Sequence, residues 1–489
     1  MQIQQLLQDI DKYVIHGNKQ PVVSGLCYDS RSVKKGDMFF CIKGYTSDGH
    51  LFAEKAVKKG AGVVVTERWL PISDEVTQIV VKDTRLAMAV ISANYYGNPS
   101  RGMKMLGITG TNGKTTITYM LKAIGEAAGK KVGLIGTIKN MIGDEELPAE
   151  RTTPESMDLQ ALLARMRKEG VDWVVMEVSS HALELKRVAA ITFDVGVFTN
   201  MTQDHLDFHK TFEQYRDAKR KLFDRSNIAC VNTDDDTGAF MLDGFKGKAY
   251  TFGLRRQQDF CAQDIEITPR GVSFCTSLPE GEPMRMSLAI PGIFSVYNAL
   301  SALSAAYALG VDANISREAL CKLKGVDGRF ESLQTGGREF HVILDYAHSP
   351  DGLENILKTA KSFAKGRIVT LFGCGGDRDQ TKRPIMGEIA GKYSDFCVIT
   401  SDNPRTEEPY AIMQMIEEGM KRTQCAYIMI ENRREAIRYV LGNAQKDDII
   451  ILAGKGHETY QEIHGVKNHF DEKEIVSEIL AEFDTKEES

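Results

Sequence analysis

Features that mark several protein classes are missing from this 489-residue chain. It has no surplus of positive charge, because 61 Lys and Arg stand against 67 Asp and Glu, and it has no basic run. General nucleic-acid binding is therefore disfavoured. No apolar run approaches the length of a membrane span, and no basic region followed by an apolar segment stands at the N-terminus. We expect a cytoplasmic protein with neither a nucleic acid nor a membrane as partner.

Disulfide and repeat signatures are missing as well. The nine cysteines, spread from Cys27 to Cys425, are odd in number and form no C-x-x-C pair, which suits a reducing compartment. No internal repeat or low-complexity segment is present. What remains is an ordinary globular composition, 42% hydrophobic and 26% charged, in a chain long enough for about three domains.

The most informative stretch is the glycine-rich segment 106–116, which stands between an apolar strand and a predicted helix. Glycines allow several backbone N–H groups to face one anion, and the helix N-terminus and Lys114 add positive charge. Thr115 is then placed to hold Mg²⁺ through its hydroxyl. The segment departs from the pattern G-x-x-x-x-G-K-[ST], because Ile108 stands where the first glycine is expected. A glycine-rich turn with a surface lysine is the simpler alternative.

Three α/β domains are predicted from the order of apolar and polar segments. Residues 1–98 form a small α/β unit with strands at 37–42 and 61–65 and a helix at 51–59. Residues 99–330 form a central ATP-binding domain with a mainly parallel sheet, and residues 331–489 form a Rossmann-like domain. A linker rich in turn-forming residues, 96–100, separates the first two.

In the central domain, the apolar runs 173–181 and 194–200 end in polar residues, as parallel strands buried on both faces do. Ligands bind beyond the carboxyl ends of such strands, which places Glu177 and the loop 202–207 near a triphosphate. By itself, the charged segment 215–223 predicts a solvated helix. Hairpins are expected over 258–290, followed by a helix over 295–309 that leaves Asn298 free to meet a nucleotide.

Four strands of the C-terminal domain, at 342–344, 368–372, 396–400 and 449–453, each lead into a polar turn. These turns should converge at one edge of the sheet. The glycines of 373–376 suggest a dinucleotide site, but they lack the G-x-G-x-x-G spacing, and we disfavour a nicotinamide cofactor.

Taken together, these segments resemble the Mur ligase family, the amide-forming enzymes of peptidoglycan precursor synthesis. The resemblance covers the whole chain and rests on eight segments: 28–31, 110–116, 152–154, 177–181, 204–207, 328–331, 345–350 and 454–458. It is strongest to members that add the third amino acid to UDP-N-acetylmuramoyl-L-alanyl-D-glutamate. It implies ATP as co-substrate, Mg²⁺ as cofactor, and a set of ligand-binding residues.

The resemblance assigns roles position by position. ATP would be bound by Gly110, Thr111, Asn112, Gly113, Lys114, Thr115, Thr116, Asn298, Arg329 and Asp345. The UDP-muramoyl-dipeptide would be bound by Ser30, Thr152, Thr153, Ser179 and Arg187, with Tyr45 and Thr46 near the uridine. Magnesium would be bound by Thr115, Glu177, His205 and Lys219. The catalytic set would be Lys114, Glu177, His205 and Lys219.

The resemblance changes the interpretation of Lys219. It is similar to the family lysine that carbon dioxide converts to a carbamate, N6-carboxylysine, which then serves as a carboxylate-like magnesium ligand. The modification needs a neutral amine, which burial and nearby cations favour. Lys221 is the neighbouring alternative.

The third substrate is inferred from Asp402, Asn403, Pro404 and Arg405, which resemble the family's motif for meso-diaminopimelate. This amino acid differs from lysine by a second, distal carboxylate, which a planar guanidinium can bind through two parallel hydrogen bonds. Arg405 and Arg378 would form that clamp, with Asp402, Asn403, Gly454 and Glu458 around the distal ammonium and carboxylate. A turn with a solvated arginine is the alternative.

The implied reaction joins three small molecules. The D-glutamate γ-carboxylate would attack the γ-phosphorus of ATP to give an acyl phosphate, and the diaminopimelate amine would displace phosphate. His205 and His348 are candidates for the base. We expect a monomer whose C-terminal domain closes on ATP binding. The alternatives are an L-lysine-adding ligase, a folate-glutamylating ligase and a nucleotide-switched scaffold without catalysis.

Overall fold

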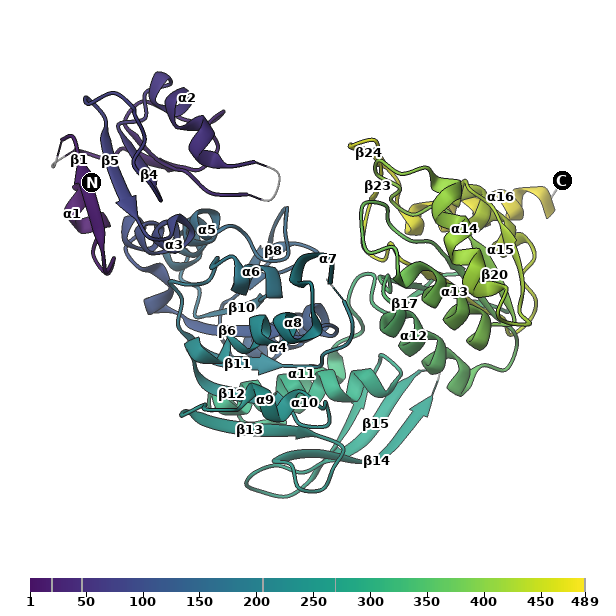
Figure 1. Cartoon of the computed structure of the whole chain (residues 1–489). Helices are drawn as coiled ribbons and strands as arrows, with labels where there is room; N and C mark the ends of the chain where they lie inside the picture. Colours follow the sequence, from purple (N-terminus) through teal and green to yellow (C-terminus); the bar gives the residue numbers. More distant parts are fainter. Residues whose placement is uncertain (19–20, 45–46, 205, 269, 488–489) are drawn as a thin grey trace.

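The computed structural model describes residues 1–18, 21–44, 47–204, 206–268 and 270–487, and contains three α/β units in chain order (Figure 1). The N-terminal unit (purple) and the C-terminal unit (green to yellow) stand at opposite ends of the central one. Three predicted site residues, Tyr45, Thr46 and His205, lie outside the described residues. Among the helices of the described part, none combines the length and apolar character that crossing a membrane requires.

The N-terminal unit is a five-stranded sheet in the order β1-β5-β4-β3-β2, in which only β1 runs antiparallel to its neighbour. Its strands are β1 (Tyr13–His16), β2 (Gly25–Cys27), β3 (Asp37–Phe40), β4 (Val63–Thr66) and β5 (Thr77–Val81). Its helices are α1 (Ile3–Leu6), η1 (Gly49–Phe52), α2 (Ala53–Lys58) and α3 (Thr84–Tyr95), with η2 (Pro99–Gly102) leading out. The predicted strands are confirmed. The predicted helix is also present, although it begins with a 3₁₀ turn that Asp48 caps.

The central unit is built on an eleven-stranded sheet in the order β16-β15-β14-β13-β12-β11-β6-β10-β7-β8-β9. Strands β6, β7 and β10–β14 are parallel, and the two ends of the sheet are antiparallel. The strands are β6 (Lys104–Thr109), β7 (Val132–Ile135), β8 (Asn140–Ile142), β9 (Glu145–Leu147), β10 (Trp173–Glu177), β11 (Phe193–Phe198), β12 (Ser226–Asn232), β13 (Lys248–Gly253), β14 (Phe260–Thr268), β15 (Gly271–Thr276) and β16 (Met284–Leu288).

Helices cover both faces of this central sheet, which explains why its strands are apolar on both sides. One face packs against α4 (Lys114–Ala127), α10 (Ile293–Ala308) and α11 (Ala313–Lys322). The opposite face packs against α5 (Ser156–Lys168), α6 (Ser180–Glu184) and α8 (Phe212–Arg220). The remaining short helices are α7 (Leu206–His209), η3 (Phe223–Arg225) and α9 (Gly238–Met241). The predicted hairpins correspond to β14, β15 and β16, and the predicted alanine-rich helix is α10.

The C-terminal unit is a six-stranded sheet in the order β17-β18-β22-β19-β20-β21, parallel except for β17. Its strands are β17 (Glu331–Leu333), β18 (His341–Asp345), β19 (Ile368–Phe372), β20 (Phe396–Ile399), β21 (Ala426–Met429) and β22 (Ile449–Ala453), followed by the hairpin β23 (Tyr460–Ile463) and β24 (Val466–His469). One face packs against α12 (Pro350–Phe363), α13 (Lys382–Tyr393) and α14 (Pro409–Met420), and the other against α15 (Arg433–Gly442) and α16 (Glu472–Glu487). All four predicted strands are confirmed.

The prediction that the charged segment 215–223 forms a solvated helix is wrong in one respect. Helix α8 buries three side chains, Tyr215, Ala218 and Lys219. Positions i, i+3 and i+4 share one face of a helix, so this face packs on the sheet while the other charged residues point outward. Lys219, with an exposed fraction of 1%, is therefore a buried residue.

Candidate active site

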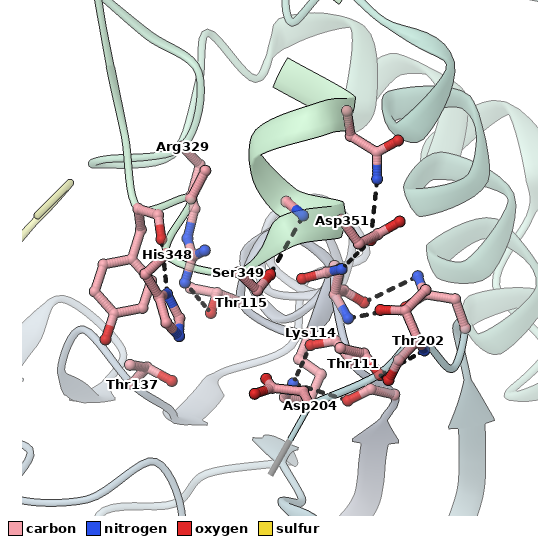
Figure 2. A pocket seen from close by; sticks show the side chains of 18 of the residues that line it. Thr111, Lys114, Thr115, Thr137, Thr202, Asp204, Arg329, His348, Ser349 and Asp351 are labelled. Carbon is pink, nitrogen blue, oxygen red and sulfur yellow. Dashed lines mark hydrogen bonds between the residues drawn. The ribbon is translucent and has the colours of Figure 1, made fainter. Parts of the chain in front are cut away.

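A cavity of about 540 Å³ lies between the central and C-terminal units (Figure 2). Its central wall is formed by the loop between β6 and α4, by residues after β10 and by α10. Its C-terminal wall is formed by the turns that follow β18, β19, β20 and β22. Asp345, Gly375, Asp402 and Gly454 each come from a different one of these strand ends, as parallel topology requires.

The loop after β6 adopts the conformation of a phosphate cradle. Gly113 has a φ of +89°, and a Cβ placed there would lie 2.5 Å from Oδ1 of Asn298, so glycine is required. Lys114 opens α4 and its Nζ donates to the carbonyls of Gly110 and Thr111 at 2.9 and 2.8 Å. Burial lowers the pKa of Lys114, and the charges of Glu177 and Asp204 oppose this. The cradle thus presents helix N–H groups and one cation to the cavity.

Glu177 ends β10 with its buried carboxylate beside the cradle. Its Oε1 accepts from the Thr137 N–H at 2.9 Å and its Oε2 accepts from the Thr137 hydroxyl at 3.0 Å. That hydroxyl also lies 3.0 Å from the hydroxyl of Thr152. Thr137, which was not predicted as a site residue, therefore orients the carboxylate proposed for the metal.

Lys219 lines the same cavity from α8, with its Nζ 4.2 Å from the centre of the Tyr215 ring. Burial, reinforced by the charge of Lys114, lowers the pKa of Lys219 well below its usual value. The neighbouring Lys221 is half-exposed and contacts Glu184. Burial thus favours the neutral form of the Lys219 amine, which is the form that reacts with carbon dioxide.

Across the cavity, residues of the C-terminal side face the cradle, among them Arg329 and Asp351 (Figure 2). The Arg329 guanidinium donates to the Thr115 hydroxyl at 3.1 Å, and the Asp351 carboxylate accepts from the Asn112 amide at 2.5 Å. Asp345 accepts backbone N–H bonds at 2.6 and 2.7 Å from the residues at 330 and 347, and burial raises its pKa. Arg329 and Asp345 were predicted, whereas Asp351 was not.

The turns after β20 and β22 form a polar cluster on the C-terminal wall. The Asn403 amide donates to Oε2 of Glu458 at 2.8 Å. Burial raises the pKa of Glu458, and the charge of Lys455 opposes the rise only in part. Burial acts in the same direction on Asp402, but the charges of Lys455 and Arg433 outweigh it and hold the pKa of Asp402 below its usual value.

Arg405 lines the cavity beside this cluster and is held by the turn after β19 and by strand β23. Its guanidinium donates to the Gly376 carbonyl at 2.6 Å, and its Nε lies 3.5 Å from a carboxylate oxygen of Glu462. Its φ of +53° is left-handed, a conformation that costs a non-glycine residue on the order of 1–3 kcal/mol. Arg378 also lines the cavity and is exposed, while Pro404 is buried outside the cavity lining.

His348 reaches the cavity from the turn after β18 (Figure 2). Its Nδ1 lies 2.9 Å from the carbonyl of Tyr346, so Nδ1 is the protonated nitrogen and Nε2 carries the lone pair. Burial and the charge of Lys382 lower the pKa of His348 to about 4. This imidazole is neutral at pH 7 and acts as a hydrogen-bond acceptor.

Residues predicted for the dipeptide substrate form a second network beside the cavity. The Thr153 hydroxyl donates to the Glu177 carbonyl at 2.8 Å and accepts from the Ser179 N–H at 3.1 Å. Arg187 donates to the Thr153 carbonyl at 2.9 Å and pairs with Glu155 at 2.8 Å. Of the predicted set, Thr152 and Ser179 line the cavity, Thr153 and Arg187 support it from behind, and Ser30 lies in the N-terminal unit after β2.

The cavity brings most of the predicted residues of the central and C-terminal units together. Those that line it are Gly110, Thr111, Asn112, Gly113, Lys114, Thr115, Thr116, Thr152, Glu177, Ser179, Lys219, Asn298, Arg329, Asp345, Arg378, Asp402, Asn403, Arg405, Gly454 and Glu458. Ser30, Thr153, Arg187 and Pro404 do not line it. Thr137, Tyr215 and Lys455 were not predicted. Of these three, Tyr215 left a signal in the sequence: it stands four residues before Lys219, and this spacing places both side chains on one face of a helix.

Three family models match the chain in order. They are described as Mur ligase family, catalytic domain, over residues 22–96; Mur ligase middle domain over 108–306; and Mur ligase, glutamate ligase domain, over 328–456. The chain belongs to the Mur ligase family. As a Mur ligase it is an ATP-dependent amide ligase with three α/β domains, as the sequence predicted.

Individual relatives agree with this family. A UDP-N-acetylmuramoyl-L-alanyl-D-glutamate–2,6-diaminopimelate ligase of Caldanaerobacter subterraneus subsp. tengcongensis is 52% identical over 483 residues, covering 99% of each chain. A solved structure of a ligase with the same name is 32% identical with a TM-score of 0.68, covering 94% of this Mur ligase and 95% of that chain. The MurF ligase of Thermotoga maritima in complex with ADP has a TM-score of 0.63 at 19% identity, covering 94% and 98%; it supports the fold.

Proposed function

We propose that this Mur ligase adds meso-diaminopimelate to the D-glutamate γ-carboxylate of UDP-N-acetylmuramoyl-L-alanyl-D-glutamate, with hydrolysis of ATP to ADP, in peptidoglycan precursor synthesis. One observation carries the proposal. A single cavity is lined by a phosphate cradle, the Glu177 carboxylate, the buried Lys219 and a polar cluster containing Arg405. The 52% identical relative that bears the name of this reaction supports it.

Chemistry at the cradle would begin with attack of the γ-carboxylate on the γ-phosphorus of ATP. Gly110 to Thr116 would bind the phosphates, and Asn298, Arg329 and Asp345 would bind the rest of the nucleotide. Lys114 offsets the repulsion between the two anions and stabilises charge on the transferred phosphoryl group. The P–O bond to ADP breaks as the acyl phosphate forms.

Thr115 and Glu177 would hold one Mg²⁺ and His205 a second, with the carbamate of Lys219 as a further magnesium ligand. The donor set fits, because magnesium prefers oxygen ligands and takes only one or two carboxylates together with substrate phosphates and water. When bound, the ion neutralises phosphate charge. The carbamate forms when the neutral Lys219 amine attacks carbon dioxide and loses one proton.

At the C-terminal wall, the diaminopimelate amine would attack the acyl carbon and expel phosphate. Arg405 and Arg378 would bind the distal carboxylate, while the distal ammonium would be surrounded by Asp402, Asn403, Gly454 and Glu458. A site with buried polar partners rejects an analogue that leaves them unpaired, which would disfavour L-lysine. His348, neutral with its Nε2 lone pair free of the proton, would accept a hydrogen bond from the attacking amine.

The dipeptide substrate would extend from the cavity toward the N-terminal unit. We propose Thr152, Thr153, Ser179 and Arg187 for its peptide part and Ser30, Tyr45 and Thr46 for its UDP part. We also propose domain boundaries at 98/99 and 330/331, and a monomeric enzyme that uses these small molecules alone.

Phosphate release tests the proposal directly. The enzyme is given ATP, Mg²⁺ and UDP-N-acetylmuramoyl-L-alanyl-D-glutamate with meso-diaminopimelate, with L-lysine, or with no amino acid. We expect turnover with diaminopimelate that exceeds turnover with lysine at least a hundredfold. Preferential turnover with lysine would refute the Arg405 clamp, and turnover with neither would refute the proposed reaction.

A further inference from the structure

Lys455 lies at the centre of the cluster on the C-terminal wall, although it does not line the cavity. It follows β22, is 0% exposed, and stands next to Gly454, which does line the cavity. Its ammonium contacts four oxygen atoms from three segments: Tyr460 O at 2.8 Å, Asn403 Oδ1 at 3.1 Å, and Asp402 Oδ1 and Glu458 Oε2 at 3.4 Å each. The sequence alone suggested no role for this residue.

The charges around Lys455 do not cancel. Asp402 and Glu458 are two carboxylates close to one ammonium, and both line the cavity. Two other ion pairs lie nearby, and in each of them the two charges cancel: Arg433 with Glu472 at 2.8 Å, and Arg405 with Glu462 at 3.5 Å. Other titratable groups that interact electrostatically with the cluster include His348, Tyr346, Tyr460 and Cys374. The cluster therefore offers one uncompensated negative charge to the cavity.

We propose that Lys455 is the positioning residue of the amino-acid site: it holds Asp402 and Glu458 together as two ionised carboxylates, so that both recognise the ammonium group of the incoming amino acid. The inference rests on the proposed function and adds a residue to it. Without a cation between them, two neighbouring carboxylates share a proton, so the pair keeps one negative charge and only one of the two carboxylates remains ionised to meet the ammonium.

This role predicts a distinctive pH signature for Lys455→Met. The acid limb of the pH profile of kcat/KM for diaminopimelate should move upward by at least one pH unit, since the shared proton is lost only at higher pH. The KM for diaminopimelate should rise at least tenfold, and the KM values for ATP and the dipeptide substrate should stay within twofold. Lys455→Arg keeps the charge and should retain the wild-type acid limb.

Arg367→Met is the matched control. Arg367 pairs with the buried Asp448 at 2.6 Å at the opposite, amino-terminal edge of the same sheet. It should destabilise the C-terminal domain without moving the acid limb. If Arg367→Met and Lys455→Met give the same profile, or if all three KM values rise together, Lys455 is only a structural residue and the inference is wrong.

An unfolding measurement covers the case in which Lys455→Met folds poorly or the proposed reaction fails. In urea at pH 8, Lys455→Met with Glu458→Gln should be more stable than Lys455→Met alone, because the second change removes the repulsion that the first one creates. Equal or lower stability of the double variant would overturn the inference. This comparison needs no turnover, so it separates failure of the proposed function, seen as no activity of the wild-type enzyme, from failure of the role of Lys455.

Discussion

The two walls of the cavity solve the problem of binding charged ligands in different ways. The central wall uses main-chain geometry, with Gly113 at positive φ and Lys114 at the start of a helix, on one continuous loop. The C-terminal wall uses side chains from four separate turns, and Lys455 links two of them, those after β20 and β22. In the proposed function, the first arrangement would bind phosphate, a group common to many ligands, and the second would bind one particular amino acid.

The two walls also differ in their electrostatics. On the central wall, burial lowers the pKa of both Lys114 and Lys219, and the charge of Lys114 adds to the effect on Lys219. The C-terminal wall instead pairs opposite charges and keeps Asp402 ionised. A chemical modification is therefore expected on the central wall and a preformed ion network on the other.

Removing the Lys219 side chain should have the largest effect on activity. Lys219→Ala removes the amine that would carry the carbamate, and we expect at least a thousandfold loss of kcat, of the order that charge stabilisation at a phosphoryl group contributes. A short carboxylic acid should restore part of the activity by occupying the vacated space. Phosphate release measures both effects.

Lys221→Ala is the control for this prediction, because Lys221 is half-exposed on the same segment and pairs with Glu184. It should keep nearly full activity. Equal losses in the two variants, or an active Lys219→Ala enzyme, would remove the carbamate from the mechanism and make the two walls alike in relying on unmodified side chains.

Arg405→Ala tests the opposite wall. We expect the KM for diaminopimelate to rise by about 30-fold or more, because truncating one partner of a buried charged contact costs roughly 2–5 kcal/mol. The KM for ATP should change little, since Arg405 contacts the turn at Gly376 and Glu462 and not the cradle. Initial rates at varied concentrations of each substrate provide the measurement.

Arg422→Ala serves as the control because Arg422 is exposed and pairs with Glu388 away from the cavity lining. It should leave all KM values unchanged. An unaltered KM for diaminopimelate in Arg405→Ala would favour the alternative weighed from the sequence, a turn with a solvated arginine.

The two walls also differ in how much of each could be predicted from the sequence. The cradle could be predicted because its glycines, Lys114 and Thr115 are contiguous between a strand and a helix, although their spacing departs from the standard pattern. The convergence of four turns also followed from topology, since parallel strands end at one edge. The buried state of Lys219 did not follow from composition, because a helix rich in charged residues looks solvated until its inner face is known.

Lys455 could not be predicted for a related reason. A lysine between two glycines in a polar turn is ordinarily exposed, and nothing local indicates that Asn403 and Tyr460, 52 residues before and 5 after it, supply its acceptors. Thr137 shows the same limit, because its contact with Glu177 spans 40 residues. Most residues predicted to bind ligands lie in one cavity, whereas the residues that orient them were not predicted.

Lowering the pH should reduce the stability of the C-terminal unit more than that of the central unit. Burial lowers the pKa of His348 to about 4 and of His457 to about 3, whereas on the central side it lowers that of His209 to about 4. An unfolded histidine takes up its proton near pH 6.5, so the unfolded state binds more protons between pH 6.5 and 4 and stability falls as the pH falls through that window. A histidine whose pKa falls from 6.5 to 4 accounts for up to about 3 kcal/mol of this loss.

Urea unfolding at pH 7 and pH 5 tests this difference. His348→Gln with His457→Gln should remove more of the stability loss at pH 5 than His209→Gln does. The same loss in all three proteins would mean that other groups govern the acid response and that the walls do not differ in this respect.

The smallest effect is expected where the two walls touch. The Asp351 carboxylate accepts from the Asn112 amide across the cavity and from Asn355 within α12 at 3.1 Å. Asp351→Ala removes one contact across the cavity, worth about 1 kcal/mol or fivefold in a population of closed molecules, and leaves the contact of Arg329 with Thr115 in place. With ATP and both substrates, small-angle scattering should show compaction of the wild-type enzyme and less compaction of Asp351→Ala.

Asn355→Ala is the control for the contact between the walls, because it removes only the bond within the helix and should behave as wild type. The cradle backbone is held separately, by Asn200 Oδ1 at 2.9 Å from the Asn112 N–H, so the cradle itself should keep its shape in both variants. No compaction in the wild-type enzyme would contradict domain closure, and the two walls would then have to exclude water from the acyl phosphate in the arrangement that the structure already has.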